Sequence, residues 1–254
     1  MPTSVQLSNV HTWYDEAGAG EPLVMLHPAG TDARAFSPNI GALAARFHVY
    51  LPERRGHGHT PDTPGPFSFD QFAQDIIEFM ERVVGAPAPL IGMSDGAIVG
   101  LHVAAKRPDL IRGLVVVAGV FHYDGWVAGV ISDEPPPDFM AQAYAEVSPD
   151  GPDHFPTVVE KLARLHETDP ALSTSDLARI ASRTLVMVGD DDQVTLEHAV
   201  AMYRAIPNAE LAVVPGTSHG LLVEKPGLCN ELIVDFLTTE PILTLAPIRR
   251  RSTP

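Results

Sequence analysis

The chain is poor in cysteine, in aromatic residues and in basic residues. Its 254 residues include one cysteine, 7% aromatic residues, and 17 lysines and arginines against 32 aspartates and glutamates. A single cysteine, Cys229, excludes an internal disulfide and a cysteine metal cluster, and it agrees with a reducing compartment. The net charge of −15 repels phosphate backbones and anionic lipid headgroups. We therefore expect neither nucleic acid nor a membrane surface as a partner.

Long apolar runs are also missing. No run approaches the roughly 18 to 20 residues that a membrane-spanning helix needs, and residues 1–5 lack the basic and apolar parts of a signal peptide. We therefore expect a cytoplasmic protein. The apolar fraction of 45% is ample for a core, and the length suits one domain, or one domain with an insertion.

Short β-rich runs alternate with helical patterns along most of the chain. Residues 5–7 and 12–15 fit an antiparallel opening pair, and a continuous apolar run such as Leu23–Leu26 is typical of a buried strand. The alternation predicts a mostly parallel sheet covered by helices. The further expected strands are 49–51, 90–91, 114–117, 184–188 and 211–214, and the expected helices are 36–46, 68–84, 97–106, 196–206 and 228–237.

The alternation stops between residues 122 and 180, where prolines punctuate two short helical stretches, 139–147 and 158–166. We call residues 122–180 the insertion. It holds eleven acidic and three basic residues, so its net charge of −8 is more than half of the total. The domains expected are a core of residues 1–121 and 181–240, this insertion, and an irregular tail of residues 241–254 that contains Arg249–Arg251.

Chemistry is concentrated first at Gly92, Ser94 and Gly96, a G-x-S-x-G pattern between an expected strand and an expected helix. Such a sharp turn exposes a serine hydroxyl, and the flanking glycines let neighbouring backbone come close. The pattern therefore makes Ser94 a candidate nucleophile. The alternative is a plain helix N-cap.

A serine nucleophile needs a histidine base, and the histidine needs a carboxylate that orients it. Asp190–Asp192 follow the expected strand 184–188, and His219 follows the strand 211–214. Parallel strands end at the same edge of a sheet, where open α/β sheets place their ligands. We therefore expect Ser94, one of the three aspartates and His219 to converge.

With these motifs the chain resembles the α/β-hydrolase fold family over residues 3–240. Residues 26–30, Leu-His-Pro-Ala-Gly, are similar to its oxyanion turn, and residues 53–58 are similar to its Asp-x-Arg-Gly-x-Gly stretch. The resemblance implies an eight-stranded, mostly parallel sheet with helices on both faces and a small helical cap formed by the insertion. The acid of the family stands three residues after the glycine, which selects Asp192.

The resemblance also implies an oxyanion hole and a reaction without cofactor or metal. Its donors would be the backbone N–H groups of Ala29 and Asp95. Pro28 replaces the usual glycine and carries no N–H, but it is not the expected donor.

Asp95 is an unusual residue directly after a nucleophile. The Ser94-Asp95-Gly96 sequence resembles the biphenyl-hydrolase-like group that includes valacyclovir hydrolase, in which an acid here helps to bind the ammonium group of the substrate. Asp95 is therefore a candidate substrate ligand through a charge-assisted contact. The alternative is a carboxylate that caps local backbone N–H groups.

Several other residues invite a functional interpretation. His122 and Trp126 open the insertion and are candidate substrate contacts, although Trp126 equally suits an anchor between insertion and core. His57 and His59 stand two apart, but no carboxylate or cysteine pattern accompanies them, so we expect no metal. The structural roles expected for the rest are a turn-stabilising His27, a core His102 and a buried, inert Cys229.

The sequence predicts a serine hydrolase that cleaves a small carboxylic ester, lactone or related acyl substrate. Carbon–carbon bond hydrolysis and cofactor-free perhydrolase or haloperoxidase activity are alternatives with the same triad. A hydrolase-like receptor for a small ligand is an alternative of another class. An acidic insertion over Ser94 would favour neutral or cationic substrates over polyanions; a merely well-solvated surface is the other interpretation.

Overall fold

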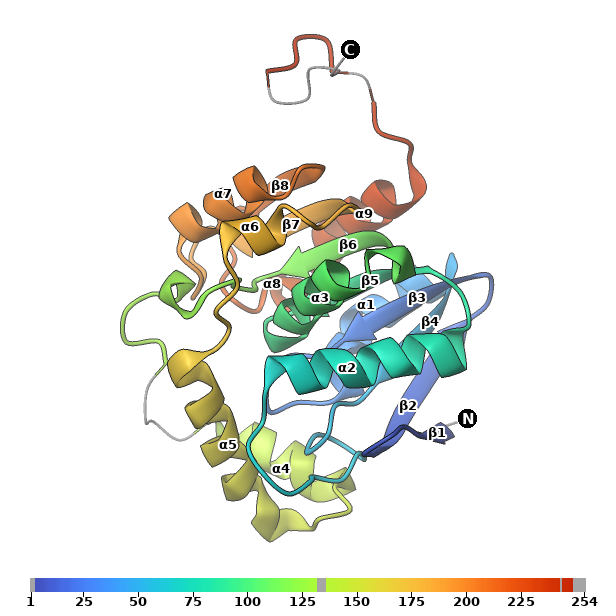
Figure 1. The fold of residues 1–254 in the computed structure, drawn as a ribbon, viewed down its shortest axis with the longest axis vertical. Coiled ribbons are helices and arrows are strands. Elements are labelled where there is room, and N and C mark those ends of the chain that lie inside the picture. The colour runs from blue at the N-terminus through green and yellow to red at the C-terminus, as the bar shows by residue number, and fades with distance from the viewer. Residues whose placement is uncertain (1–2, 132–135, 243, 249–254) are drawn as a thin grey trace.

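The structure is a computed structural model and describes residues 3–131, 136–242 and 244–248. An eight-stranded sheet forms its centre, with helices on both faces (Figure 1). The strands are β1 (Thr3–Gln6), β2 (His11–Gly18), β3 (Glu21–Leu26), β4 (Phe47–Pro52), β5 (Ala88–Met93), β6 (Ile111–Val117), β7 (Arg183–Gly189) and β8 (Ala209–Val214). The α-helices are α1 (Ser37–Ala44), α2 (Phe69–Phe79), α3 (Asp95–Lys106), α4 (Asp138–Val147), α5 (Phe155–Thr168), α6 (Thr174–Leu177), α7 (Leu196–Ala205), α8 (Leu221–Glu224) and α9 (Pro226–Thr238).

The strand order is β1-β2-β4-β3-β5-β6-β7-β8. β1 and β2 pair antiparallel, as expected for the opening pair, and β2 also runs antiparallel to β4, whereas the remaining neighbours are parallel. The mostly parallel, eight-stranded sheet predicted from the sequence is therefore confirmed. Its parallel part turns the carboxyl ends of β3, β5, β7 and β8 to one edge.

Two apolar layers hold the helices on the sheet. Side chains of α2, α3, α5 and α7 pack on one face, and side chains of α1, α8 and α9 pack on the other. Every residue of β5 is buried, which explains why the strand reads as a continuous apolar run. A Cβ at Gly100 of α3 would lie 2.8 Å from Leu90 Cδ2, so this helix rests closely on β5.

The insertion lies beside the core, where α4 and α5 stand together at one end of the molecule (Figure 1). The buried face of α5 includes Val158, Leu162 and Leu165. Polar contacts add to this packing. Arg34 donates to Glu146 of α4, and Lys161 of α5 donates to Asp62 at 2.6 Å.

Most expected elements are present, with longer strands than the sequence indicated. The helix expected over 68–84 ends as α2 at Phe79 and continues as one π-helical turn over Met80–Val84. The four-residue helices α6 and α8 were not predicted, because so few residues show no periodicity. A capping box at Ser173, in which Asp176 takes part, begins α6.

The C-terminal tail runs away from the body (Figure 1) and has no helix or strand over residues 241–242 and 244–248. The expected arginine run, residues 249–251, lies outside the described residues. Cys229 is buried in α9, as expected. Among the helices that the structure describes, none is long and apolar enough to cross a membrane.

Candidate active site

Ser94 stands in a strained turn between β5 and α3. Its backbone has a φ of 53°, a conformation that residues other than glycine rarely adopt. A Cβ at Gly96 would collide with the carbonyl oxygen of Leu26, and one at Gly92 would collide with that of Gly96. The two glycines are therefore required by close backbone contacts. Ser94 is the N-cap residue of α3, but its side chain makes no capping hydrogen bond, so capping does not account for the hydroxyl.

The structure brings Ser94, Asp192 and His219 together, and we call them the candidate triad. His219 Nε2 lies 3.0 Å from Ser94 Oγ, and His219 Nδ1 lies 2.8 Å from Asp192 Oδ1. The carboxylate accepts a hydrogen bond from Nδ1–H of His219, so Nε2 is unprotonated and free to accept the hydrogen bond from the serine hydroxyl. This is the tautomer that a general base at Ser94 requires.

The loop after β7 fixes the Asp192 carboxylate. Its Oδ2 accepts the Gly189 N–H at 2.9 Å, and its Oδ1 accepts the Val194 N–H at 3.1 Å. Burial favours the neutral acid, but the hydrogen bonds from His219 and from these amides hold the pKa of Asp192 below its usual value. The carboxylate is therefore charged and oriented. Asp190 instead binds the Thr217 N–H, which joins the acid loop to the histidine loop.

The two candidate oxyanion donors come from adjoining segments. Ala29 follows β3, and Asp95 is the first residue of α3, whose N–H has no acceptor within the helix. The collision expected for a Cβ at Gly96 places the start of α3 directly against the end of β3. Pro28 contributes its carbonyl oxygen, which accepts from the Thr31 hydroxyl at 3.0 Å.

Arg54 and His27 hold the turn that carries Ala29. Arg54 Nη2 donates to the Pro28 carbonyl at 3.0 Å, and Nη1 donates to the His27 carbonyl. The His27 ring accepts the Arg54 N–H through Nε2 and donates from Nδ1 to Pro28. Burial and the charge of Arg54 keep the pKa of His27 far below its usual value, so the ring is neutral. His27 therefore has the turn-stabilising role expected for it.

Asp95 has a partner that the sequence did not reveal. Its Oδ1 lies 2.8 Å from Nε2 of His166 in the last turn of α5, and the Asp95 residue is only 1% exposed. Burial would raise the pKa of Asp95, but the charges of His166 and Arg54 keep it below its usual value. Within the described ranges the carboxylate accepts no backbone hydrogen bond, so the capping interpretation is wrong. The contact with a substrate ammonium group stays a prediction.

Trp126 lies beside the candidate triad, whereas His122 makes other contacts. The Trp126 ring centroid is 6.0 Å from that of His219, and its backbone forms an isolated β-bridge with Val194 of the acid loop. Trp126 thus both flanks the site and anchors the insertion. His122 lies 3.1 Å from Asp124 and packs on Tyr123. These contacts give no support to His122 as a substrate contact.

The three other histidines considered in the sequence, His57, His59 and His102, make hydrogen bonds within the protein. His57 is buried and contacts the Arg55 carbonyl, His59 contacts the Glu53 carboxylate, and His102 is buried and contacts Asp70. Across the described segments, no group of three or more histidine, cysteine or acidic side chains is arranged to hold a metal ion.

Comparison with known proteins identifies the family. Residues 23–232, more than half of the chain, match the model of the Alpha/beta hydrolase family. The chain belongs to this family. The putative carbamate hydrolase RutD of Azorhizobium caulinodans is 26% identical over 249 residues, which cover 88% of this hydrolase and 94% of the relative. The human serine hydrolase BPHL is 27% identical over 92% of this chain and 85% of its own, which confirms the resemblance noted at Asp95.

Solved structures share the fold of this hydrolase. The enol-lactonase of Burkholderia xenovorans superposes with a TM-score of 0.75 at 23% identity, over 93% of this chain and 100% of its own. A meta-cleavage product hydrolase of Pseudomonas fluorescens gives 0.75 at 21% identity, over 92% and 97%. At such identities the likeness shows the fold alone.

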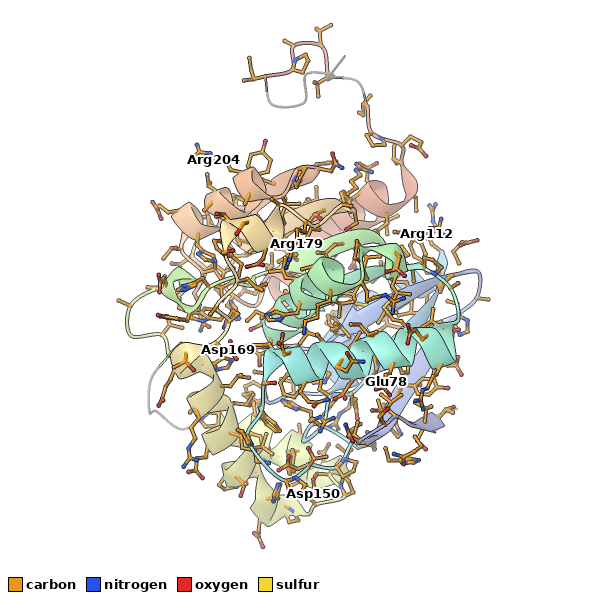
Figure 2. All side chains as sticks on the ribbon, in the orientation of Figure 1. Glu78, Arg112, Asp150, Asp169, Arg179 and Arg204 are labelled. Atoms are coloured by element: carbon orange, nitrogen blue, oxygen red, sulfur yellow. The ribbon has the colours of Figure 1, made fainter. Side chains whose placement is uncertain are left out.

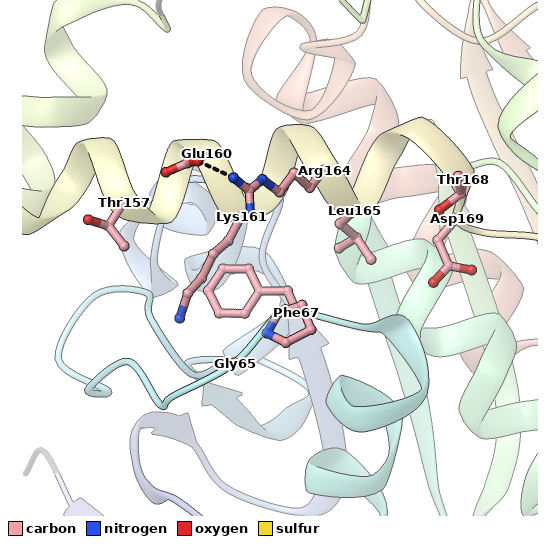
Figure 3. Close-up of a pocket in the computed structure, with 10 residues that line it drawn as sticks. Gly65, Phe67, Thr157, Glu160, Lys161, Arg164, Leu165, Thr168 and Asp169 are labelled. Carbon is pink, nitrogen blue, oxygen red and sulfur yellow. Dashed lines mark hydrogen bonds and ion pairs between the residues drawn. The ribbon is translucent and has the colours of Figure 1, made fainter.

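Two cavities of the hydrolase border opposite sides of α5. The larger, of about 560 Å³, lies between α5 and residues 65–67, and contains Lys161 and Arg164 but no member of the candidate triad (Figure 3). The smaller, of about 190 Å³, extends from Ala29 to His166 and is otherwise lined by apolar side chains and Gly30. No member of the candidate triad lines the smaller cavity either, but it adjoins the candidate site through Ala29 and through His166, the partner of Asp95.

His166 belongs to the candidate site but was not predicted from the sequence. It lies in the proline-rich insertion, 71 positions after Asp95, and no motif connects the two. The only indication in the sequence is the helical stretch 158–166, in which His166 lies on the same side as several apolar residues. That pattern by itself does not tell a core histidine from one at an active site.

Proposed function

We propose that this hydrolase cleaves a small carboxylic ester, lactone or related acyl compound through an acyl-enzyme on Ser94. The observation that carries the proposal is the continuous hydrogen-bond chain from Ser94 Oγ through His219 to Asp192. Nothing else in the described residues combines a strained, glycine-flanked hydroxyl with a base and a buried carboxylate.

In the first half of the reaction, Ser94 Oγ attacks the carbonyl carbon while His219 Nε2 takes its proton. Asp192 stabilises the imidazolium that forms and keeps its proton on Nδ1. The N–H groups of Ala29 and Asp95 bind the oxyanion, and each such donor is typically worth about 10² to 10³ in rate. His219 then gives the proton to the leaving alcohol, and Ser94 keeps the acyl group.

In the second half, water replaces the alcohol. His219 removes a proton from the water, which attacks the acyl carbon, and the proton passes to Ser94 as the acid leaves. These steps need proton transfer and hydrogen-bond donors only. The proposal therefore includes no cofactor or metal.

The proposed substrate is small and is neutral or cationic in preference to polyanionic. The cavity beside Ala29 has a volume of about 190 Å³ and a largely apolar lining, which suits a short acyl chain. The net charge of −8 on the insertion disfavours polyanions. The name of the RutD relatives, putative carbamate hydrolase, refers to another carbonyl compound that the same chemistry accepts.

Hydrolysis of p-nitrophenyl butyrate by the wild type and by Ser94→Ala tests the proposal. We expect the substitution to lower kcat by about 10⁴-fold or more, because it removes the group that bonds to the acyl carbon. Ser148→Ala, which removes a half-buried hydroxyl of the insertion that accepts the Asp150 N–H at 3.2 Å, serves as the control and should retain wild-type turnover. Equal rates in wild type and Ser94→Ala would remove Ser94 from the mechanism.

A fluorophosphonate probe separates an enzyme from a receptor of the same fold. An activated Ser94 reacts with the phosphorus and retains a covalent label that peptide mass spectrometry locates. A receptor without a reactive serine remains unlabelled while it still binds its ligand.

A further inference from the structure

His166 is the one titratable side chain on the small cavity beside the candidate triad. It extends from the last turn of α5, and the other described residues that line the cavity are apolar, apart from Gly30. Its ring centroid is 6.4 Å from that of Trp126, which in turn flanks His219. An imidazole therefore faces an apolar space close to the proposed reaction centre.

The contact with Asp95 fixes which nitrogen of His166 is occupied. Nε2 donates to Asp95 Oδ1 at 2.8 Å, and the ring makes no second hydrogen bond to any residue that the structure describes. Nδ1 is not fully buried, although the side chain of His166 is only 12% exposed. Nδ1 is thus the polar atom of His166 that is open to a ligand.

The charges around His166 favour a protonated ring. Burial would lower its pKa and so would the nearby Arg54, but the Asp95 carboxylate outweighs both, and the pKa of His166 lies above its usual value. In the protonated ring both nitrogens are donors. With Nε2–H bound to Asp95, Nδ1–H remains as a donor without an acceptor among the residues that the structure describes.

We propose that His166 is a specificity-determining residue whose Nδ1–H binds a hydrogen-bond acceptor on the acyl part of the substrate, while Asp95 positions its ring from the other side. The inference rests on the proposed acyl transfer at Ser94 and adds the class of acyl group. The cavity of about 190 Å³ is small and largely apolar, which suits a short acyl chain. The substrate is therefore a short acyl chain with an oxygen acceptor near its far end.

Both a neutral carbonyl and a carboxylate supply such an acceptor, and three matched ethyl esters distinguish them. Ethyl 4-oxopentanoate carries a ketone, monoethyl succinate carries a carboxylate, and ethyl pentanoate carries neither at nearly the same length. Titration of the acid released gives kcat/KM for each ester. We expect the wild type to prefer at least one acceptor ester over the pentanoate by about tenfold, the usual value of a hydrogen bond to a charged donor.

Substitution of His166 tests the assignment. His166→Gln keeps an amide donor near the position of Nε2, toward Asp95, but leaves none near Nδ1, so the ratio of acceptor ester to pentanoate should fall to about one. His166→Asn places an amide near Nδ1 and should retain part of the preference. Arg164→Gln removes a cation from the opposite side of the same helix and should leave the ratio unchanged.

The outcomes separate this inference from the function on which it rests. Hydrolysis of ethyl pentanoate that Ser94→Ala abolishes supports the triad, whatever happens at His166. A wild-type ratio near one overturns the role of His166, and this measurement needs no variant to fold. A ratio that His166→Gln leaves at the wild-type value, or a uniform loss on all three esters, also overturns it and leaves His166 as a purely structural link.

Discussion

The carboxyl edge of the sheet and the insertion are built differently. At the sheet edge, buried carboxylates such as Asp192 and strained backbone at Ser94 are held by several hydrogen bonds each. The insertion is held by apolar packing, by ion pairs that face solvent, such as Arg34 with Glu146, and by a few buried ones, such as Lys161 with Asp62. Figure 2 shows one of its acids, Asp150, on the periphery of the molecule.

This difference separates two tasks. The sheet edge holds the side chains that are proposed to carry out the reaction, and their hydrogen bonds leave them little freedom to move. The insertion reaches the candidate triad through Trp126 and Asp95 through His166, and its apolar side chains line the small cavity beside Ala29. Changes in the core are therefore expected to affect the rate for every substrate, and changes in the insertion to alter the choice among substrates.

The largest effect expected in the core is that of Asp192→Asn. An amide in place of the carboxylate does not hold the His219 proton on Nδ1, so Nε2 no longer accepts from Ser94. We expect kcat for p-nitrophenyl butyrate to fall by about 10⁴-fold. Asp191→Asn, a neighbour on the exposed part of the loop, is the control and should keep its rate. A loss below tenfold in Asp192→Asn would remove the carboxylate from the proposed triad.

Gly96→Ala tests the close backbone contact behind the nucleophile. The added methyl group collides with the Leu26 carbonyl, so α3 must move away from the end of β3. We expect kcat to fall by about 10²-fold or more, since one oxyanion donor is misplaced, and the melting temperature to fall as well. Gly41→Ala is a matched control, because nothing lies within 4 Å of the added carbon and helical alanine is favoured. Equal behaviour of the two variants would contradict this account of the turn.

Glu53 makes the core turns sensitive to pH. Burial raises the pKa of Glu53 to about 7 although it accepts hydrogen bonds from His59 and Ala33. At Glu53 the folded protein therefore keeps a proton that the unfolded chain has released, so the contribution of Glu53 to stability falls as the pH rises from about 4.5 to 7. At most about 3 kcal/mol is involved.

Glu53→Gln should flatten the fall in stability over that pH range, as measured by urea unfolding at pH 5 and pH 7.5. Glu231→Gln, a substitution on exposed surface of α9, should retain the wild-type difference. The same change in stability between the two pH values in wild type and Glu53→Gln would show that Glu53 titrates normally.

The smallest effect expected concerns the acidic insertion. If its charge steers substrates, added salt lowers kcat/KM for a cationic ester but not for a neutral one. Between 10 and 150 mM salt we expect about a twofold to threefold fall for butyrylcholine and none for 3,3-dimethylbutyl butyrate. Parallel salt responses would assign the acidity to solvation alone.

The sequence was sufficient for the part of the molecule that local rules govern. Continuous apolar runs identified the parallel strands, and the strand-turn-helix setting placed Ser94, while the shared edge of parallel strands brought in His219. Selection of Asp192 over Asp190 and Asp191 came from the family resemblance. The structure agrees with it, because Asp192 Oδ1 lies 2.8 Å from the histidine.

The rest depends on tertiary contacts without a sequence signature. Asp95 suggested either a ligand or a cap, and the structure pairs it with His166, which belongs to the insertion and has no motif that connects it to Asp95. The course of the turn at Pro28 likewise depends on Arg54, a residue 26 positions away. Pairs of residues so distant in the sequence can be identified only from the folded structure.

The central claim, an acyl-enzyme on Ser94, is tested most directly by acid quenching during turnover of p-nitrophenyl butyrate, followed by peptide mass spectrometry. The account predicts a butyryl group on the peptide that contains Ser94, and its absence in Ser94→Ala. Sustained turnover with no acylated peptide, or with the butyryl group on another side chain, would contradict it.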